Sequence, residues 1–391
     1  MRDLEHLSVG FVAGESSGDQ LGAALIRALR ARVPQLHCAG VAGARMAAEG
    51  CETWAQAHEL AVMGLFEPLK ELPRLALLRR RLKARFVRER PDVFIGIDAP
   101  AFNLGLAAQL RRAGLPTVQC VSPQVWAWRP GRVKLIARAC DLVLCLLPFE
   151  AEFYGRHGVR AVFVGHPLAD EIPLDVDQAR ARRELGIEGA VPVVALLPGS
   201  RLGEVERLGR DFLGAARWLE PRRPGVQFIA PMASPAVRRV FERQMDALGW
   251  HGARLLEGNA QRALAAADVV LVASGTATLE TLLSKRPMVV AYRFARLTAL
   301  AIRRLGLIKV PYFSQPNLLA GRRLVPELLQ EEVTAESLGA ALLAELESGA
   351  RREELQGEFR RIHETLRRGG ADRAAAAVIE LIGERKGGVA S

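Results

Sequence analysis

The chain of 391 residues is poor in aromatic side chains and has no cysteine pattern that would build a metal or redox centre. Phe, Trp and Tyr make up 6% of the residues, and no recognisable nucleic-acid-binding module is present, which argues against RNA or DNA as a partner. The five cysteines stand singly, without metal-ligand or redox spacing. They are typical of small core residues in a reducing compartment.

Long apolar runs are also missing. No uninterrupted run approaches the ~20 apolar residues that span a bilayer, and no signal-peptide pattern precedes the first strand-like run. We therefore expect a cytosolic protein that is at most peripheral to a membrane. The charge is unbalanced, since 54 Lys and Arg stand against 43 Asp and Glu, a formal net charge of +11. This excess favours anionic partners such as nucleotides or phospholipid surfaces.

The length and the 50% share of apolar residues are enough for two domains with sizeable cores. Strand-like runs alternate with helical patterns, which predicts parallel sheets with crossover helices. The expected strands are residues 7–13, 92–97, 115–120, 142–147 and 161–164 in the first half, and 192–197, 226–230, 269–272 and 287–291 in the second.

The predicted fold class is α/β, with two Rossmann-like domains that face a cleft. A polar, proline-containing segment at residues 165–173 is the expected linker. We predict an N-terminal domain over residues 1–170, a C-terminal domain over residues 171–365, and a C-terminal helix and tail over residues 366–391.

The most informative turn spans residues 274–280, directly after an apolar strand-like run. Free backbone N–H groups and the positive end of the helix dipole bind phosphate oxygens at such a junction. Ser274, Thr276 and Thr278 add hydroxyl donors. Glu280 lies on the helical face of Thr276, where a carboxylate can accept both hydroxyls of a ribose. A nucleoside diphosphate fits this pattern, and an ordinary capped helix start is the alternative interpretation.

A second glycine-containing turn spans residues 14–19 and is expected to lead into a helix over residues 20–32. It offers only Gly14 and Gly18, so it lacks the three-glycine pattern of a dinucleotide site. One such turn in each half of the chain favours two separate Rossmann-like halves.

Two charged residues follow strand-like runs, where open parallel sheets bind ligands. Asp98 can serve as a general base, or it can cap the helix that starts near Pro100. The Arg201 guanidinium can neutralise a departing diphosphate, or it can pair with Glu204 or Glu206 at the surface.

The Asp-x-Asp spacing at Asp175 and Asp177 is typical of a divalent-metal motif in sugar-nucleotide enzymes. Because this segment precedes a helix and does not end a strand, helix capping is the better interpretation. We predict no metal site and no cofactor.

Eight short blocks cover most of the chain: residues 14–19, 96–100, 121–128, 147–150, 165–168, 197–201, 273–280 and 311–321. In this order they resemble the signature blocks of the lipid-A-disaccharide synthase family, and the whole set is far more specific than any single loop. The chain departs from the family pattern at Ala101, where the family has a second acidic residue. This departure leaves Asp98 as the stronger candidate base.

The resemblance implies an inverting glycosyltransferase of the two-domain GT-B type, in the synthesis of the lipid A of lipopolysaccharide. It would transfer 2,3-diacylglucosamine from UDP to the 6-hydroxyl of 2,3-diacylglucosamine 1-phosphate. The products would be the β-1,6-linked disaccharide 1-phosphate and UDP. The implied partners are the two lipids, an anionic surface at the cytoplasmic face of the inner membrane and a second copy in a homodimer, with no nucleic acid.

The resemblance also implies roles for individual residues. Asp98 and Arg201 would be catalytic. The opposite wall of the cleft would hold the acceptor phosphate or the diphosphate with Glu15, Ser17, Gly18 and Asp19. The C-terminal domain would bind UDP through a larger set, namely Arg201, Ser274, Gly275, Thr276, Thr278, Glu280, Gln315 and Asn317.

Some of these residues have a second interpretation. Gln315 and Asn317 lie in a loop bracketed by prolines, where their side chains can instead fix the turns of the loop itself. Trp126 and Trp128 face the same way if their segment is extended. They then border an acyl chain or pack in the core.

A basic segment at residues 70–90 carries nine Lys or Arg residues against two acids. On a helix its leucines form a stripe that is edged by cations, a pattern typical of helices at anionic membranes. The alternative is an ordinary helix whose stripe packs on the sheet. The predicted membrane contact comprises Leu65, Phe66, Leu75, Arg79, Arg80 and Arg81.

Three alternatives to this function stay open. Two are other GT-B enzymes that use UDP-N-acetylglucosamine, the glucosaminyltransferase of peptidoglycan assembly and the 2-epimerase. The third is a nucleotide-dependent lipid-binding module without turnover. Release of UDP in the presence of both lipid precursors separates these cases.

Overall fold

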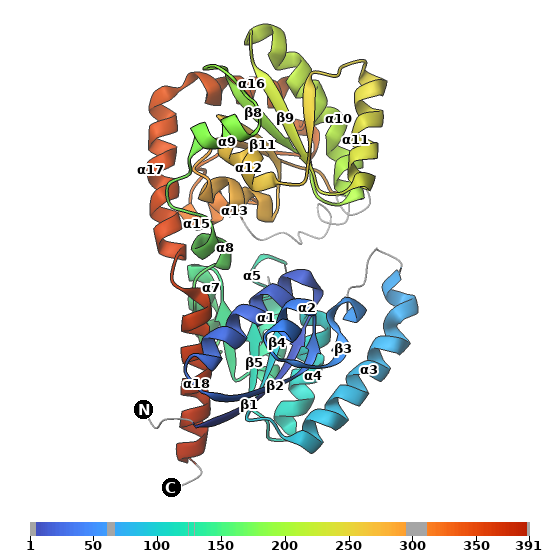
Figure 1. Ribbon diagram of the computed structural model, residues 1–391, viewed down its shortest axis with the longest axis vertical. Coiled ribbons are helices and arrows are strands. Elements are labelled where there is room, and N and C mark those ends of the chain that lie inside the picture. Colours follow the sequence, from blue (N-terminus) through green and yellow to red (C-terminus); the bar gives the residue numbers. More distant parts are fainter. Residues whose placement is uncertain (1–4, 61–66, 124, 129, 295–310, 389–391) are drawn as a thin grey trace. The chain divides into compact units, whose positions relative to one another are not determined.

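The computed structural model describes residues 5–60, 67–123, 125–128, 130–294 and 311–388 (Figure 1). The chain divides into two compact units, one formed by Met1–Asp170 with Leu366–Ser391 and the other by Glu171–Thr365. Each unit contains one sheet whose paired strands all run parallel. The predicted α/β class is confirmed.

The sheet of the first unit has the order β3-β2-β1-β4-β5-β6-β7. All five residues of β4 are buried, as expected of a parallel strand that is covered on both faces. The strands are β1 (His6–Ala13), β2 (Gln35–Ala42), β3 (Glu52–Gln56), β4 (Val93–Ile97), β5 (Thr117–Cys120), β6 (Leu142–Cys145) and β7 (Ala161–Phe163).

Helices cover both faces of this sheet (Figure 1). One face packs on α1 (Glu15–Arg30) and α18 (Gly370–Gly388), where Leu25, Leu29 and Ile382 are buried. The other face packs on α3 (Glu67–Glu89), α4 (Pro100–Arg112), α6 (Val133–Ala139) and α7 (Pro148–Gly155). The short elements are α2 (Ala44–Ala48), η1 (Ala57–Leu60), α5 (Val125–Trp128), η2 (Pro130–Arg132) and α8 (Pro167–Glu171).

The last helix belongs to the first unit. Arg160, near β7, forms ion pairs with Glu380 and Glu384 of α18, and Arg32 pairs with Asp372 at 2.7 Å. Asp170 accepts hydrogen bonds from the backbone N–H groups of Gly369 and Gly370. The chain that returns after residue 365 is therefore tied to this unit at several points.

The sheet of the second unit has the order β10-β9-β8-β11-β12-β13. Its strands are β8 (Val193–Leu197), β9 (Gln227–Met232), β10 (Ala253–Glu257), β11 (Val269–Ala273), β12 (Met288–Tyr292) and β13 (Glu327–Leu329). Around it lie α9 (Gln178–Glu184), α10 (Leu202–Leu219), η3 (Glu220–Arg222), α11 (Pro235–Leu248), α12 (Ala260–Ala266), α13 (Thr276–Leu283), α15 (Gln315–Ala320), η4 (Gln330–Glu332), α16 (Ala335–Glu347) and α17 (Gly349–Leu366). Helices α10, α11 and α16 enclose one core with the sheet.

The helix predicted over residues 20–32 begins five residues earlier, at Glu15. Gly14 alone makes the turn, with φ −97° and ψ 143°, so the chain passes from β1 directly into α1. A Cβ atom at Gly14 would stand 2.5 Å from the Cβ of Ala99, and this close approach requires glycine. Residues 15–19, predicted as part of the turn, therefore form the start of the helix.

None of the helices in the described ranges is both long and apolar enough to cross a bilayer.

Candidate functional site

The strand order gives each sheet a topological switch point. In the first sheet β1 pairs with β4, although the chain runs on from β1 to β2 at the other side. In the second sheet β8 and β11 stand in the same relation. Ligands of open parallel sheets bind outside the carboxyl ends of such strands. These ends lead to Gly14 and Asp98 in the first unit, and to Arg201 and Ser274 in the second.

The start of α13 is open to an anion. Gly275 precedes the helix with φ 154°, and no atom lies within 4 Å of the position that a Cβ would take. The first intrahelical bond joins the N–H of Thr278 to the carbonyl of Gly275 at 3.1 Å, while Thr276 is exposed. Backbone N–H groups at a helix start bind phosphate oxygens. The roles predicted for Gly275 and Thr276 in binding UDP stay predictions.

The hydroxyls of Ser274 and Thr278 are already engaged within the protein. Ser274 Oγ donates to the carbonyl of Phe313 at 2.8 Å. Thr278 Oγ1 donates to the carbonyl of Gly275 at 2.7 Å and accepts from the N–H of Gln315 at 3.3 Å. In this structure both side chains tie the start of α13 to the segment before α15, so their expected role as free phosphate donors is corrected.

Glu280 is half-buried one helical turn after Thr276. Burial raises the pKa of its carboxyl. Within the described part of the chain, its oxygens accept no hydrogen bond and no cation pairs with them. A carboxylate with open acceptor positions suits the two hydroxyls of a ribose.

Arg201 lies at the start of α10 with its side chain 82% exposed, and its Nη1 is 4.0 Å from Glu204 Oε1. Glu204 Oε2 also accepts from the N–H groups of Ser200 and Arg201, at 3.0 and 3.3 Å. The carboxylate of Glu204 therefore already occupies the start of α10. The helix start of α13 and the exposed guanidinium of Arg201 are what this edge offers to a diphosphate.

The loop before and after α15 is organised by a buried carboxylate that the sequence analysis missed. Glu327 accepts from the N–H groups of Phe313 and Ser314, at 3.0 and 2.9 Å, and from Asn317 Nδ2 at 2.8 Å. Asn317 is fully buried, and its Oδ1 accepts from the N–H groups of residues 324 and 325. The expected contact of Asn317 with substrate is therefore corrected to the alternative, fixation of its own loop. Gln315 differs, because its buried Oε1 has no partner in the described structure.

The residues of the predicted acceptor wall lie in the first turns of α1. Asp19 is buried and its carboxylate is engaged within the protein, since it accepts from the N–H groups of Gly43, Arg45 and Met46 at 2.9 to 3.0 Å. Its assignment to a ligand-facing wall is therefore corrected, and its side chain caps α2. Ser17 is exposed, Gly18 is buried, and the side chain of Glu15 lies outside the described residues.

Asp98 follows β4 with a left-handed backbone, at φ 53°, and Ala99 continues it at φ 41°. Ala99 is the N-cap of α4, which has no side-chain cap, so Asp98 does not cap this helix. The described residues place no hydrogen-bond donor on the half-buried carboxylate. It is thus available to take a proton at the carboxyl edge of the sheet.

Two buried amides hold the backbone around Asp98, and the sequence analysis assigned a role to neither. Asn103 Nδ2 donates to the carbonyl of Asp98 at 2.8 Å, and Gln119 Nε2 donates to the same carbonyl at 3.2 Å. The available signal was a side-chain amide within a short strand, because Gln119 stands between Val118 and Cys120 in β5.

The tryptophan segment is helical and not extended. Residues 125–128 form α5, so the extended segment under which Trp126 and Trp128 were expected to face the same way is not present. Trp126 packs edge-on against Phe149 and donates its indole N–H to Glu150 Oε1 at 3.1 Å. The side chain of Trp128 lies outside the described residues.

The apolar stripe of α3 packs on the first unit. Phe86 and Leu82 are buried, and Leu75 packs against the same core. Arg79 lies against α4, where it donates to the carbonyl of Ala101 at 3.1 Å and stacks over Phe102. Leu75 and Arg79 are therefore wrong as membrane contacts. Arg80 and Arg81 are exposed, and Leu65 and Phe66 lie outside the described residues.

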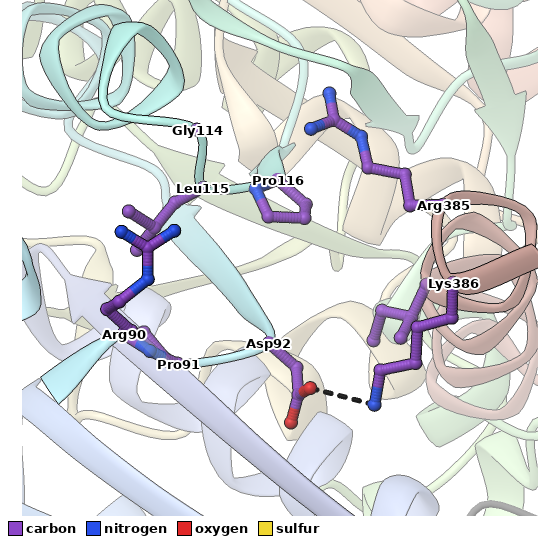
Figure 2. A pocket seen from close by; sticks show the side chains of 9 residues that line it. Arg90, Pro91, Asp92, Gly114, Leu115, Pro116, Arg385 and Lys386 are labelled. Atoms are coloured by element: carbon purple, nitrogen blue, oxygen red, sulfur yellow. Dashed lines mark ion pairs between the residues drawn. The ribbon is translucent and has the colours of Figure 1, made fainter. Parts of the chain in front are cut away.

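A cavity of about 700 Å³ lies at the amino edge of the first sheet, opposite to Asp98 (Figure 2). Figure 2 shows Lys386 reaching Asp92. This ion pair measures 2.9 Å, and Arg385 pairs with Asp141 at 2.6 Å. The charged groups that line this cavity thus hold the C-terminal end of α18 against the first unit. The catalytic candidates lie at the other ends of the strands.

The Asp-x-Asp segment is a helix cap, as predicted. Asp177 accepts from the N–H of Arg180 at 2.8 Å at the start of α9, and Asp175 pairs with Arg360 at 2.8 Å.

Comparisons with solved structures define the class of protein. A UDP-N-acetylglucosamine 2-epimerase of Neisseria meningitidis, bound to UDP-GlcNAc, matches with a TM-score of 0.61 at 11% identity, over 97% of this chain and 100% of that chain. The calicheamicin glycosyltransferase CalG4 matches with a TM-score of 0.54 at 18% identity, over 98% and 99%. The fold is that of a GT-B glycosyltransferase with two Rossmann-like domains.

Sequence comparisons define the family. Residues 9–381 match the family model described as lipid-A-disaccharide synthetase. The lipid-A-disaccharide synthase of Alkalilimnicola ehrlichii is 52% identical over 380 residues, covering 96% of this chain and 99% of the relative. That of Azotobacter vinelandii is 53% identical over 381 residues, covering 96% and 98%. The chain belongs to the lipid-A-disaccharide synthase family, which confirms the predicted family and the prediction of a glycosyltransferase.

Glu150 generates a pH-dependent prediction. Burial raises the pKa of its carboxyl to about 7 in the folded protein, from about 4.5 when exposed. Between these two pKa values the native state holds a proton that the unfolded state has released. The contribution of this proton to the free energy of unfolding is complete below about pH 4.5 and is lost as the pH rises through 7. Between pH 5 and 8 we expect the parent protein to lose about 2–3 kcal/mol relative to Glu150→Gln.

Urea unfolding of both proteins at the two pH values measures this difference. Glu152→Gln is the matched control, because Glu152 lies on the same helix and is exposed. A stability difference between parent and Glu150→Gln that stays constant with pH would contradict the assignment.

Proposed function

We propose that this protein transfers 2,3-diacylglucosamine from UDP to the 6-hydroxyl of 2,3-diacylglucosamine 1-phosphate, with inversion, and releases UDP. The observation that carries the proposal is identity above 50% over nearly the whole chain to relatives named lipid-A-disaccharide synthase. The likeness to UDP-N-acetylglucosamine 2-epimerases supports only the fold, because the identity is 11–15%.

In this reaction the acceptor hydroxyl loses a proton as its oxygen attacks the anomeric carbon. Asp98 is the proposed general base. Three features support it: its place after β4 at a switch point, the absence of a capping role, and a carboxylate that carries no hydrogen bond from the described residues. A carboxylate in this setting takes a proton without first giving up a partner.

UDP leaves with its charge on the diphosphate, and the second unit is proposed to bind it. The N–H groups at the start of α13 and the guanidinium of Arg201 supply positive charge. Thr276 adds an exposed hydroxyl, and Glu280 receives the ribose hydroxyls. The partnerless Oε1 of Gln315 is a further acceptor for the donor sugar or base. Ser274 and Thr278 are proposed to hold the start of α13 in place through their hydrogen bonds within the protein.

The first prediction from this proposal tests the base. Asp98→Asn is expected to retain binding of the UDP-sugar and to lower kcat by about 10²- to 10⁴-fold, the scale of general-base catalysis. Release of UDP with both purified lipids, at saturating donor, measures it. Asp92→Asn, at the other end of β4, is the matched control and keeps kcat within about twofold. Near-normal turnover of Asp98→Asn removes this residue from the mechanism.

A second prediction concerns metal ions. Asp177 is engaged as a cap and Asp175 in an ion pair. The diphosphate charge is met by Arg201 and the start of α13. We expect the rate of UDP release to stay within about twofold in excess chelator. Full loss of activity that magnesium or manganese restores would contradict this.

The third prediction concerns the membrane, since both substrates carry acyl chains. We propose that the exposed cations of α3, which include Arg80 and Arg81, contact an anionic bilayer surface. Each basic residue near such a surface contributes on the order of 1 kcal/mol. Reversal of both charges, in Arg80→Glu/Arg81→Glu, should weaken binding to vesicles with phosphatidylglycerol at least about tenfold at low salt.

The control variant reverses two exposed arginines of the second unit, in Arg239→Glu/Arg243→Glu, and is expected to bind like the parent. Binding of the α3 variant as tight as that of the parent would exclude this surface. A homodimer, the assembly that the family resemblance implies, is a separate proposal that light scattering of the purified protein tests.

A further inference from the structure

The carboxyl edge of the first sheet holds three residues in a backbone conformation that their side chains disfavour. Asp98, Ala99 and Val121 have φ values of 53°, 41° and 70°, and none is a glycine. For a β-branched residue such as Val121 a positive φ is a genuine outlier. Such a conformation persists only when the surrounding structure enforces it, and it gathers at functional sites.

The side chain of Gln119 reaches both strained turns, the one after β4 at Asp98 and the one after β5 at Val121. Gln119 is 1% exposed, and its Nε2 lies 3.2 Å from the carbonyl of Asp98. The same atom lies 3.2 Å from the carbonyl of Cys120 and 3.3 Å from that of Val121. A primary amide has two N–H groups, which it shares among these three acceptors. The side-chain nitrogen of Gln119 thus contacts the backbone at the ends of both β4 and β5.

One backbone bond and one further side-chain bond lie at the same corner. The N–H of Asp98 donates to the carbonyl of Cys120 at 3.0 Å, and Asn103 Nδ2 donates to the carbonyl of Asp98 at 2.8 Å. Asn103 also reaches the carbonyls of Val12 and Ile97, so it anchors the corner to β1. Gln119 differs from Asn103 in that it also bonds the carbonyls of Cys120 and Val121 at the end of β5.

We propose that Gln119 is a positioning residue for the glycosyl transfer, because its amide fixes the backbone that carries the Asp98 carboxylate. The inference rests on the proposed role of Asp98 as general base. Loss of the amide removes one of the two side-chain hydrogen bonds to the Asp98 carbonyl, together with the bonds to the carbonyls of Cys120 and Val121, and the strained turn relaxes toward an ordinary φ. The carboxylate then shifts away from the acceptor hydroxyl, while the nucleotide-binding groups of the second unit stay unchanged.

A merely structural role makes a different prediction. Thr117, on the same strand β5, is also a buried polar residue, and its hydroxyl donates to the carbonyl of Ala139 at 2.7 Å. It lies at the amino end of the strand, away from Asp98. Thr117→Val therefore lowers stability without touching the corner, and it serves as the matched control.

The experiment measures kcat, the KM for the UDP-sugar and the unfolding midpoint of Gln119→Met, which keeps the side-chain volume and removes the donors. We expect kcat to fall about 10- to 100-fold, the effect of a displacement of about 1 Å at a reacting group. The KM for the donor should stay within about twofold. Thr117→Val should keep kcat within about twofold at a comparable loss of stability.

The double variant Asp98→Asn/Gln119→Met tests whether the amide acts through the base. If it does, the double variant is no slower than Asp98→Asn alone, because the two changes remove the same contribution. Ala99→Gly in the Gln119→Met background is the rescue, since glycine accepts a left-handed φ without strain. It should recover part of the lost kcat, and it keeps the test possible if Gln119→Met alone does not fold.

The outcomes separate the two proposals. A normal kcat in Gln119→Met beside an inactive Asp98→Asn overturns the positioning role and leaves the base in place. A normal kcat in Asp98→Asn overturns both. Equal losses of kcat in Gln119→Met and Thr117→Val assign the effect to stability and overturn the positioning role.

Discussion

The parallel order of the strands is the constraint on which the rest of this structure depends. In a parallel sheet every strand ends at the same edge, and every crossover helix begins there, so helix N-termini and strand-end side chains are gathered without any long-range design. At a switch point two such crossovers leave in opposite directions. Gly14 and Asp98 in the first sheet, and Arg201 and Ser274 in the second, owe their positions to this rule.

Buried polar side chains hold the backbone in place at the carboxyl edges of both sheets. Asp19 caps α2, Glu327 holds the segment before α15, and Gln119 joins β4 to β5. Each satisfies backbone groups that would otherwise be buried without a partner, at a cost of about 1–3 kcal/mol per group. The residues that were expected to touch substrate and prove to be engaged, such as Asn317, belong to the same framework.

The sequence predicts the strands and helices well, but it predicts poorly which buried polar side chains bond the backbone. Both results have physical reasons. Strands such as β4 and β11 are continuous apolar runs, because both faces are covered. The four strands that the pattern misses are β2, β3, β10 and β13. They carry polar or charged residues at partly exposed positions, or span only three residues. The start of α1 is missed because a single glycine makes the turn, and no capping side chain marks it.

The candidate site shows the same division. A hydroxyl or carboxylate in a motif can face a ligand or the backbone, and its spacing in the sequence is identical in both cases. Thr276 and Thr278 differ by two residues, yet the first is exposed and the second is fully buried with its hydroxyl engaged. Which of the two meets the ligand depends on where the segment before α15 packs, and that contact joins residues nearly forty positions apart.

Electrostatics then separates the two helix starts of the second unit. Both α10 and α13 begin at the switch point, and both dipoles favour an anion there. At α10 the carboxylate of Glu204 already binds the N–H groups of Ser200 and Arg201 just before the helix, so a phosphate there would meet a like charge. At α13 the only carboxylate of the helix, Glu280, lies a full turn further along and leaves the first N–H groups open. This difference supports the proposed diphosphate site at the start of α13, with the exposed guanidinium of Arg201 as a cation at the same edge of the sheet.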